Sequence, residues 1–371
     1  MISSPILLAA GGTGGHLFPA EALAHALDAR GLAVELVTDE RALRYGGAFP
    51  ARALHAIPAA TPRGGSLIAK AVAVARLAMG VAQAVALLRR IKPAAVIGFG
   101  GYPTVPPLLA AAYLGLPSAL HEANGVMGKA NRFLAGRVDR IAAGLPTLSV
   151  PPPLKGKVVV TGNPVRPNVL AAAQTPYPGF DHGVFRLLVT GGSQGARVMA
   201  DIVPEALAAL PEDLRPRVRV VQQTRPEDIA RVEAIYSGAG ANAEIAPFFT
   251  DLPARIAAAH YVIARAGAST VSELAVIGRP AMLVPLPHSL DQDQAANAAF
   301  LEQAGGAETV RQSDFTPEFL TRRLTELINA PAELALRAEA AKRVGVADAA
   351  ERLADLIIDV AREGAAKRSN G

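Results

Sequence analysis

Two glycine-rich loops stand at equivalent places in the two halves of this chain. The first, GGTGG, begins at Gly11 after the apolar run 5–10, and the second, GGSQG, begins at Gly191 after the expected strand 185–190. Each loop joins a segment typical of a buried strand to a segment typical of a helix. Since a glycine-rich turn from strand to helix belongs to parallel α/β sheets, the repeat predicts two similar α/β domains.

Strand and helix patterns alternate along both halves. Strands are expected at 6–10, 33–38, 94–97, 117–121, 158–161, 185–190, 217–222, 261–264 and 280–285. Helices are expected at 18–29, 105–114 and 226–237, after the second glycine loop as far as 210, and from 268 onward. This predicts an α/β fold of two Rossmann-like, doubly wound parallel-sheet domains facing a central cleft. Ligands of such sheets bind beyond the carboxyl ends of the strands.

The turn-rich segment TGNPVRPN, residues 161–168, marks the expected domain boundary, because its two X-Pro steps interrupt regular structure. The predicted domains are 1–163 and 164–344. A helix within 345–371 is expected to pack back on the first domain. A length of 371 residues suits two domains.

Composition excludes some chemistry and favours anionic partners. The chain has no cysteine, which rules out disulfides, a cysteine nucleophile and thiolate metal sites, and suits a reducing compartment. The formal net charge of +5 favours a nucleic acid, a phosphorylated metabolite or an anionic lipid surface. No nucleic-acid motif stands out, so no nucleic-acid partner is expected. The first ten residues lack the basic region of a signal peptide.

The segment 67–90 is apolar over most of its expected helical circumference. Its uninterrupted apolar part, 77–88, has 12 residues, whereas a spanning helix needs about 20. Two alternatives remain open. The helix is either buried against a sheet, or it lies in a membrane interface with its basic residues near the lipid headgroups. Those basic residues are Lys70, Arg76, Arg89 and Arg90.

A dinucleotide site is a weaker interpretation of the first loop. The G-x-G-x-x-G fingerprint would need glycine at the position of Leu17, although the acidic pair Asp39 and Glu40 does follow the second strand. The acidic motif DQD, 291–293, has the D-x-D pattern that binds Mg²⁺ or Mn²⁺ in some enzymes. It also opens an expected helix, where the helix dipole favours acids in any case. We therefore predict no metal site and no cofactor.

Six motifs occur in the order, and at about the spacing, of the MurG family. They are GGTGGHLFPA (11–20), GFGGYPT (98–104), HEANGVMGKANR (121–132), GNPVR (162–166), TGGSQGAR (190–197) and RAGASTVSE (265–273). The resemblance covers residues 5 to about 345. It implies a GT-B fold and an inverting, metal-independent transferase. This enzyme would move N-acetylglucosamine from UDP-N-acetylglucosamine to lipid I, a polyprenyl-diphosphate-linked muramoyl peptide. It would make lipid II at the cytoplasmic face of the bacterial membrane, as a peripheral protein.

The resemblance assigns roles on the donor side. The matching glutamate, Glu273, clamps the ribose, because a carboxylate accepts hydrogen bonds from two adjacent hydroxyls. Phe249 matches the place beside the uracil, although it is equally compatible with a core residue. Asn124 matches a place between donor and acceptor. Backbone N–H groups at helix starts suit the diphosphate. The remaining donor residues that the resemblance implies are Thr13, Gly14, Gly15, Arg166, Ser193 and Gln294.

Two positions depart from the pattern of some relatives. Asp293 stands where they carry glutamine, and Ala266 where they carry serine. The resemblance therefore does not assign Asp293 a contact with the sugar. At Ala266, one possible hydrogen-bond donor to phosphate is lost. Asn297, by contrast, matches a position near the sugar.

On the acceptor side the resemblance points to His16, Tyr102, His121 and Glu122. His16 is the candidate catalytic residue, since the attacking hydroxyl must lose a proton and the loop contains no carboxylate. The dipole of the following helix would keep its imidazole neutral and basic. Binding of the acceptor diphosphate by His16 is the open alternative. His121 is equally compatible with a core histidine at the end of its strand.

Two other functions stay open at this point. One is another GT-B enzyme for UDP-sugars, an epimerase or a small-acceptor transferase. The other is a catalytically inactive UDP-sugar-binding scaffold at the membrane. The presence of His16, Arg166 and Glu273 together argues against the scaffold.

Overall fold

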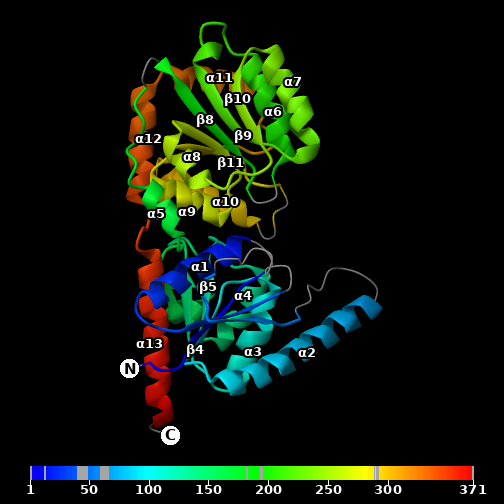
Figure 1. The fold of residues 1–371 in the computed structure, drawn as a ribbon, viewed down its shortest axis with the longest axis vertical. Helices are drawn as coiled ribbons and strands as arrows, with labels where there is room; N and C mark the ends of the chain where they lie inside the picture. The colour runs from blue at the N-terminus through cyan, green and yellow to red at the C-terminus, as the bar shows by residue number, and fades with distance from the viewer. Residues whose placement is uncertain are drawn as a thin grey trace. The chain divides into compact units, whose positions relative to one another are not determined.

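The chain forms two compact units, each with its own parallel sheet (Figure 1). The computed structural model describes residues 2–11, 14–39, 49–58, 67–180, 183–192, 195–287, 289 and 292–369. The N-terminal unit comprises Met1–Arg166 and Ala347–Gly371, and the C-terminal unit comprises Pro167–Val346. The division expected from the sequence differs from these bounds by three residues at the first boundary and two at the second.

The sheet of the N-terminal unit has the order β3-β2-β1-β4-β5-β6-β7, with all neighbours parallel. Its strands are β1 (Ile6–Ala9), β2 (Val34–Thr38), β3 (Ala53–Ala56), β4 (Ala95–Gly98), β5 (Ser118–Glu122), β6 (Arg140–Ala143) and β7 (Val158–Val160). The central strands β1 and β4 are entirely buried, as strands with helices on both faces must be. The pairing of Ala9 with Gly98 brings their carboxyl ends to one level.

Helices cover both faces of this sheet. They are α1 (Gly14–Asp28), α2 (Leu67–Ile91), η2 (Tyr102–Thr104), α3 (Val105–Tyr113), α4 (Lys129–Leu134), η3 (Ala135–Arg137), η4 (Pro152–Lys157) and α13 (Ala349–Ser369). Helices α1 and α13 share one hydrophobic cluster with the strands, and α3, α4 and the end of α2 share another. An ion pair of 3.1 Å between Arg30 and Asp355 also joins α13 to this unit.

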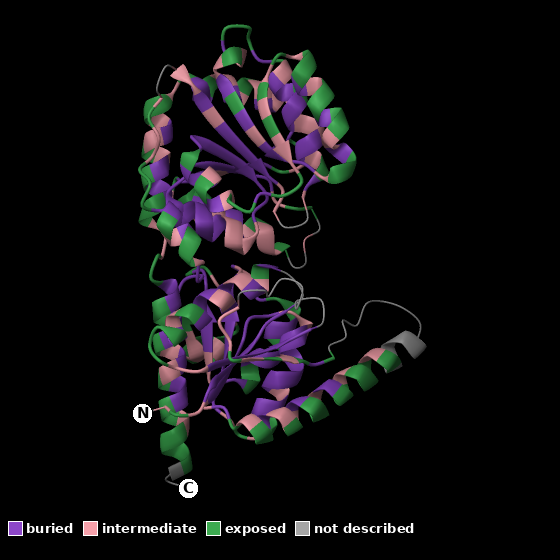
Figure 2. Ribbon diagram, viewed as in Figure 1, coloured by how far each residue is buried: buried purple, intermediate pink, exposed green. Residues whose placement is uncertain are grey.

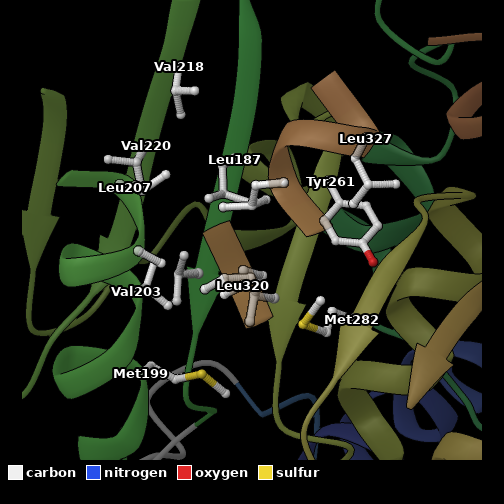
Figure 3. Packing of buried hydrophobic residues seen from close by; sticks show 14 of the residues in the cluster. Leu187, Met199, Val203, Leu207, Val218, Val220, Tyr261, Met282, Leu320 and Leu327 are labelled. Atoms are coloured by element: carbon white, nitrogen blue, oxygen red, sulfur yellow. The ribbon is translucent and has the colours of Figure 1, made fainter. Parts of the chain in front are cut away.

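The C-terminal unit repeats the architecture with the strand order β10-β9-β8-β11-β12-β13. Its strands are β8 (Phe185–Thr190), β9 (Val218–Gln223), β10 (Asn242–Ala246), β11 (Tyr261–Ala264), β12 (Ala281–Leu283) and β13 (Ala307–Thr309). Its helices are α5 (Pro167–Ala172), α6 (Arg197–Ala208), η6 (Arg215–Arg217), η7 (Pro226–Asp228), α7 (Ile229–Gly238), α8 (Leu252–Ala258), α9 (Ala268–Ile277), α10 (Asp293–Gln303), α11 (Pro317–Ile328) and α12 (Pro331–Arg343). Leu187 and Val220 of the sheet pack against Val203 and Leu320 of helices in one buried cluster (Figure 3).

Helix α2 is largely exposed, so the expectation of a helix buried against the sheet is wrong for most of its length. Most of α2 is coloured exposed or intermediate in Figure 2. Val74 and Met79 are 65% and 52% exposed, whereas Ala84 and Leu88, nearer the end of the helix, are buried. Over Val72–Ile91 the helix is long and apolar enough to cross a membrane. Of the residues in this apolar segment, 17% are buried. The physical reason is that only one side of α2 packs against the hydrophobic cluster around α3, through Leu77, Ala84 and Leu88 among others.

Helix α1 begins four residues before the expected start at residue 18. Its first residue, Gly14, is buried, and a Cβ added there would lie 3.0 Å from the ring of Phe18. Gly14 and Gly15 of the glycine-rich segment therefore belong to the helix, and Gly14 allows Phe18 to fold back over the first turn. His16 consequently lies within the first turn of α1 rather than ahead of it.

Candidate active site

The candidate acceptor side lies where three strands of the N-terminal unit end. Gly98 of β4 pairs with Ala9 of β1 on one side and with Leu120 of β5 on the other. The segments that follow these strands carry His16, the glycine pair 100–101 and the motif that begins at His121. The register of a parallel sheet thus gathers three of the six sequence motifs at one edge.

The imidazole of His16 lies against the backbone of the glycine pair. A Cβ added to Gly100 would lie 3.1 Å from His16 Cε1, and one added to Gly101 would lie 3.2 Å from His16 Cδ2. Both glycines have positive φ, 93° and 73°, which side chains rarely adopt. This loop therefore requires glycine twice over, for its conformation and for the space that the ring occupies.

Burial lowers the pKa of His16, while the nearby Glu122 carboxylate and the backbone of Phe99 act against that shift. The net direction favours a neutral ring near neutral pH. Burial is the largest cause of the lowered pKa of His16, and the expected effect of the helix dipole acts in the same direction. A neutral imidazole in this place can accept a proton.

Glu122 is the most highly connected polar group of this edge. Its Oε1 accepts hydrogen bonds from Asn124 N and Asn124 Nδ2, both at 3.0 Å. Its Oε2 accepts from Gly128 N and Asn131 Nδ2, both at 2.9 Å. With the side chain 2% exposed, these donors satisfy a buried carboxylate and tie residues 122–131 into one loop. Asn124 is thereby fixed by Glu122.

His121 is a buried residue at the end of its strand. It is 0% exposed, and its ring centroid lies 5.5 Å from that of Phe99. Burial lowers the pKa of His121 to about 4, with the backbone of Gly162 opposing and the charge of His16 adding to the shift. His121 is therefore neutral at physiological pH and belongs to the packing beneath His16.

The GNPVR motif closes the same edge. Asn163 Nδ2 donates to Ala123 O at 2.9 Å. The amide of Asn163 also fills the space beside Gly144, because a Cβ added to Gly144 would lie 1.8 Å from Asn163 Oδ1. The guanidinium carbon of Arg166 lies 3.9 Å from the ring centroid of Phe18 in α1. Arg166 is the last residue of the first segment of the N-terminal unit. The sequence had placed it in the other domain.

The second glycine loop is organised by an amide. Gln223 Oε1 accepts from Thr190 Oγ1 at 2.8 Å and from Gly191 N at 3.2 Å. Gln223 Nε2 donates to Gly192 O at 3.1 Å. A Cβ on Gly191 would lie 2.2 Å from Ala196 N, so the loop turns back on itself too closely for any side chain there.

The remaining donor candidates stand at the carboxyl ends of strands in the same unit. Glu273 is buried in α9, the helix that follows β11. Gln294 Oε1 accepts from Leu286 N at 3.0 Å, and Asn297 Nδ2 donates to Ala266 O at 3.1 Å. Both amides thus hold loops. Asp293, the first residue of α10, accepts at Oδ1 from Gln294 N at 2.8 Å.

Phe249 is 8% exposed and lies under Arg255, whose guanidinium carbon is 4.2 Å from the ring centroid. The neighbouring Phe248 is 63% exposed. A contact of Phe249 with a base would therefore come from its backbone, while the free ring at this strand end belongs to Phe248.

Within its described residues, the structure places most of the predicted site residues in two groups. The N-terminal unit holds Gly14, Gly15, His16, Tyr102, Asn124 and Arg166, and the C-terminal unit holds Phe249, Glu273 and Gln294. Thr13, Ser193 and Asp291 of the DQD motif lie outside the described residues. Among the described residues, no three His, Cys, Asp or Glu side chains are grouped as a metal site would require.

Sequence reasoning did not single out the amides that support the site: Asn131, Asn163 and Gln223. Each lies inside or beside a recognised motif, and each donates to or accepts from backbone of another loop. A polar residue without charge next to a glycine turn is the only signal the sequence offers for them.

Comparison with known proteins agrees with this arrangement. The family model of the glycosyltransferase family 28 N-terminal domain matches residues 6–143, and that of the family 28 C-terminal domain matches residues 186–353. A UDP-N-acetylglucosamine--N-acetylmuramyl-(pentapeptide) pyrophosphoryl-undecaprenol N-acetylglucosamine transferase of Methylobacterium sp. (strain 4-46) is 59% identical over 359 residues, 96% of either chain. A protein of the same name from Methylobacterium nodulans is 59% identical over 360 residues, also 96% of either chain.

A solved structure extends the likeness to three dimensions. The crystal structure of Acinetobacter baumannii MurG superposes with a TM-score of 0.78 at 30% identity, over 96% of this chain and 99% of that one. Both parallel-sheet units are thus those of a GT-B glycosyltransferase. With its two family 28 domains and relatives that share more than half of its residues over nearly their full length, the chain belongs to the MurG family of N-acetylglucosaminyltransferases.

Proposed function

We propose that this protein transfers N-acetylglucosamine from UDP-N-acetylglucosamine to the muramoyl 4-hydroxyl of lipid I, which makes lipid II for peptidoglycan synthesis. The observation that carries the proposal is the near full-length identity of 59% to transferases whose names state this donor and acceptor. The enzyme is a hexosyltransferase. Its acceptor is lipid-linked. The alternative function, a GT-B enzyme with a small acceptor, is therefore less well supported.

His16 is the proposed general base. The acceptor hydroxyl attacks the anomeric carbon, the bond from that carbon to the diphosphate breaks, and the hydroxyl proton passes to the neutral imidazole. The lowered pKa of His16 supports this role, because a protonated ring could not accept the proton. Contact with the glycine pair holds the ring in one orientation. Tyr102, at the start of η2 in the same loop, is proposed to bind the acceptor.

The donor is proposed to be bound by residues of both units. Glu273 would accept hydrogen bonds from the ribose hydroxyls, the backbone of Phe249 would face the uracil, and Gln294 would bind the sugar. The loops that carry Thr13, Gly14, Gly15 and Ser193, together with Arg166 and Asn124, would bind the diphosphate and the sugar. Preorganised N–H groups and arginine stabilise a leaving diphosphate without a metal ion. Turnover is therefore expected to continue in EDTA.

The membrane contact is proposed to be peripheral, through α2 at the cytoplasmic face. The support is its composition and exposure: Val74 and Met79 are exposed on the same helix as Arg76, Arg89 and Arg90. An exposed apolar stretch flanked by basic residues favours a helix that lies in an anionic lipid interface. Lys70 belongs to the same helix, and its side chain lies outside the described part of the chain.

One experiment separates the proposed reaction from its rivals. The full chain is mixed with UDP-N-acetylglucosamine, and released UDP is measured with and without a lipid I analogue. A lipid-dependent release supports the transferase. Release without acceptor would point to an epimerase-like or hydrolytic activity, and binding without release would point to an inactive scaffold. Either result would contradict the proposal.

A further inference from the structure

A second arginine, Arg225, stands at the glycine loop of the C-terminal unit. It follows β9 by two residues, and the pairing of Val189 with Gln222 sets the end of β9 beside the end of β8. The loop after β8 contains Gly191 and Gly195. Arg225 therefore occupies the carboxyl edge of the sheet, on the opposite side of β8 from β11.

The side chain of Arg225 lies on Gly195. A Cβ added to that glycine would stand 2.9 Å from Arg225 Cγ, and the glycine has a φ of 65°. Arg225 Nη2 donates to Gly195 O at 3.2 Å. One hydrogen bond and the packing of its stem thus hold the guanidinium beside the loop, with most of its five N–H groups left over.

The remaining donors and the charge of Arg225 have no acidic partner within the part of the chain that the structure describes. Its Nε is buried and has no hydrogen-bond acceptor there. The nearest acid in sequence among the buried residues, Asp228, binds Arg231 instead, at 2.8 Å. A buried N–H without an acceptor is costly, so the arrangement calls for an acceptor that the described residues do not provide.

Arg265 stands on the other side of the same loop, directly after β11. It is 9% exposed and donates to Val284 O at 3.0 Å and to Gln312 Oε1 at 2.6 Å, again with no carboxylate partner among the described residues. Burial and the charge of Arg225 lower the pKa of Arg265, which places the two cations within electrostatic reach of each other. Two unpaired arginines that flank a glycine loop attract a multiply charged anion.

We infer that Arg225 is a further binding residue for the diphosphate of the donor and of the UDP that leaves, supplied by the loop after β9. The inference rests on the proposed function, which supplies the nucleotide. A planar guanidinium offers paired N–H groups to phosphate oxygens. A bound diphosphate would therefore supply an acceptor for the buried Nε of Arg225. Because free UDP carries more negative charge than the sugar nucleotide, Arg225 is expected to bind the product more tightly than the substrate.

The test compares UDP with uridine in the full chain. Arg225→Gln, Arg225→Lys and the control Arg219→Gln, an exposed arginine at the other end of the same strand, are titrated with both ligands at two salt concentrations. Arg225→Gln is expected to weaken UDP binding about tenfold to a hundredfold and to flatten its salt dependence, while uridine binding stays within about twofold. Arg225→Lys, which keeps the charge, is expected to lie between wild type and Arg225→Gln.

Two results would overturn the inference. Unchanged UDP affinity in folded Arg225→Gln would remove Arg225 from the site. Equal weakening of UDP and uridine, with Arg225→Lys as poor as Arg225→Gln and the salt dependence unchanged, would mean that the arginine only supports Gly195. A wild-type chain that bound no UDP would instead overturn the proposed function, and the inference with it.

Discussion

Gly100 leaves the space that the ring of His16 occupies: a Cβ there would lie 3.1 Å from His16 Cε1 and 3.3 Å from Nδ1. The two residues are far apart in sequence and belong to different motifs. Their contact makes the loop after β4 the surface that orients the candidate base. The same hypothetical Cβ would lie 3.4 Å from Asn131 Nδ2, so the loop held by Glu122 borders the ring as well.

His16→Ala is expected to lower kcat by about 10²–10⁴-fold, the usual contribution of a general base. UDP affinity should stay near that of the wild type, because the ribose and uracil contacts lie elsewhere. His25→Ala, an exposed histidine of the same helix, is the control. Steady-state kinetics with a soluble lipid I analogue measures the effect. A normal kcat with a raised KM for the acceptor would make His16 a diphosphate ligand instead.

The pH profile of kcat tests the protonation state of His16. Since burial lowers the pKa of His16 below its ordinary value of 6.5, the base stays neutral at and above that pH. Activity should therefore be constant above pH 6.5 and fall only as the pH drops through the lowered pKa. The residual activity of His16→Ala should lack this acidic limb. An acidic limb centred above pH 6.5 would contradict the assignment.

Gly100→Ala is expected to reduce kcat while UDP affinity persists, because the added methyl would displace the ring of His16. The positive φ at residue 100 adds a backbone cost of about 1–2 kcal/mol. Gly115→Ala is the matched control: Gly115 also has a positive φ, 62°, but a Cβ there meets nothing within 4 Å. Both variants should lose similar stability in thermal unfolding, and only Gly100→Ala should lose turnover. Equal activity in both would show that the contact does not orient His16.

Glu273→Ala is expected to weaken UDP binding about tenfold to a hundredfold, which corresponds to the loss of charge-assisted hydrogen bonds worth about 1.5–3 kcal/mol. Titration calorimetry measures the change, and Glu233→Ala, an exposed glutamate of α7, serves as the control. If a folded Glu273→Ala bound UDP as the wild type does, the ribose role would have to be abandoned.

Replacing the exposed apolar side chains of α2 tests the membrane contact. The double variant Val74→Ser with Met79→Ser should sediment less with anionic vesicles, whereas Leu336→Ser, which is 66% exposed in the other unit, should not change binding. Neutralising Arg76, Arg89 and Arg90 should weaken binding as well, by about 1 kcal/mol for each charge near the surface, and salt should have the same effect. Binding that is indifferent to all of these changes would exclude α2 as the contact.

Much of this fold follows from sequence alone. Alternating strand and helix patterns and glycine loops predicted two parallel α/β domains, and the family relationship confirms the fold and the transferase activity. The predicted strands 185–190 and 261–264 match β8 and β11 at both ends. Long apolar runs identify central strands because such strands are buried on both faces. The strands β3, β6, β10 and β13 were not predicted. Three of them, β3, β10 and β13, are edge strands, where exposed and polar residues interrupt the apolar pattern. The inner strand β6 has only four residues and begins with Arg140, so its apolar run is too short to mark a strand.

The sequence by itself determined which chemical groups are present. They include His16 in the first glycine-rich motif, the carboxylate of Glu273, and arginines at two turns. Only the tertiary structure decided their neighbours. It set His16 against Gly100, gave Glu122 its four donors, and left Arg225 beside Gly195 with no acidic partner among the described residues. The physical reason is that burial and charge act over ångströms in space. The pKa of a histidine and the free donors of an arginine therefore depend on the loops that the sheet register brings together.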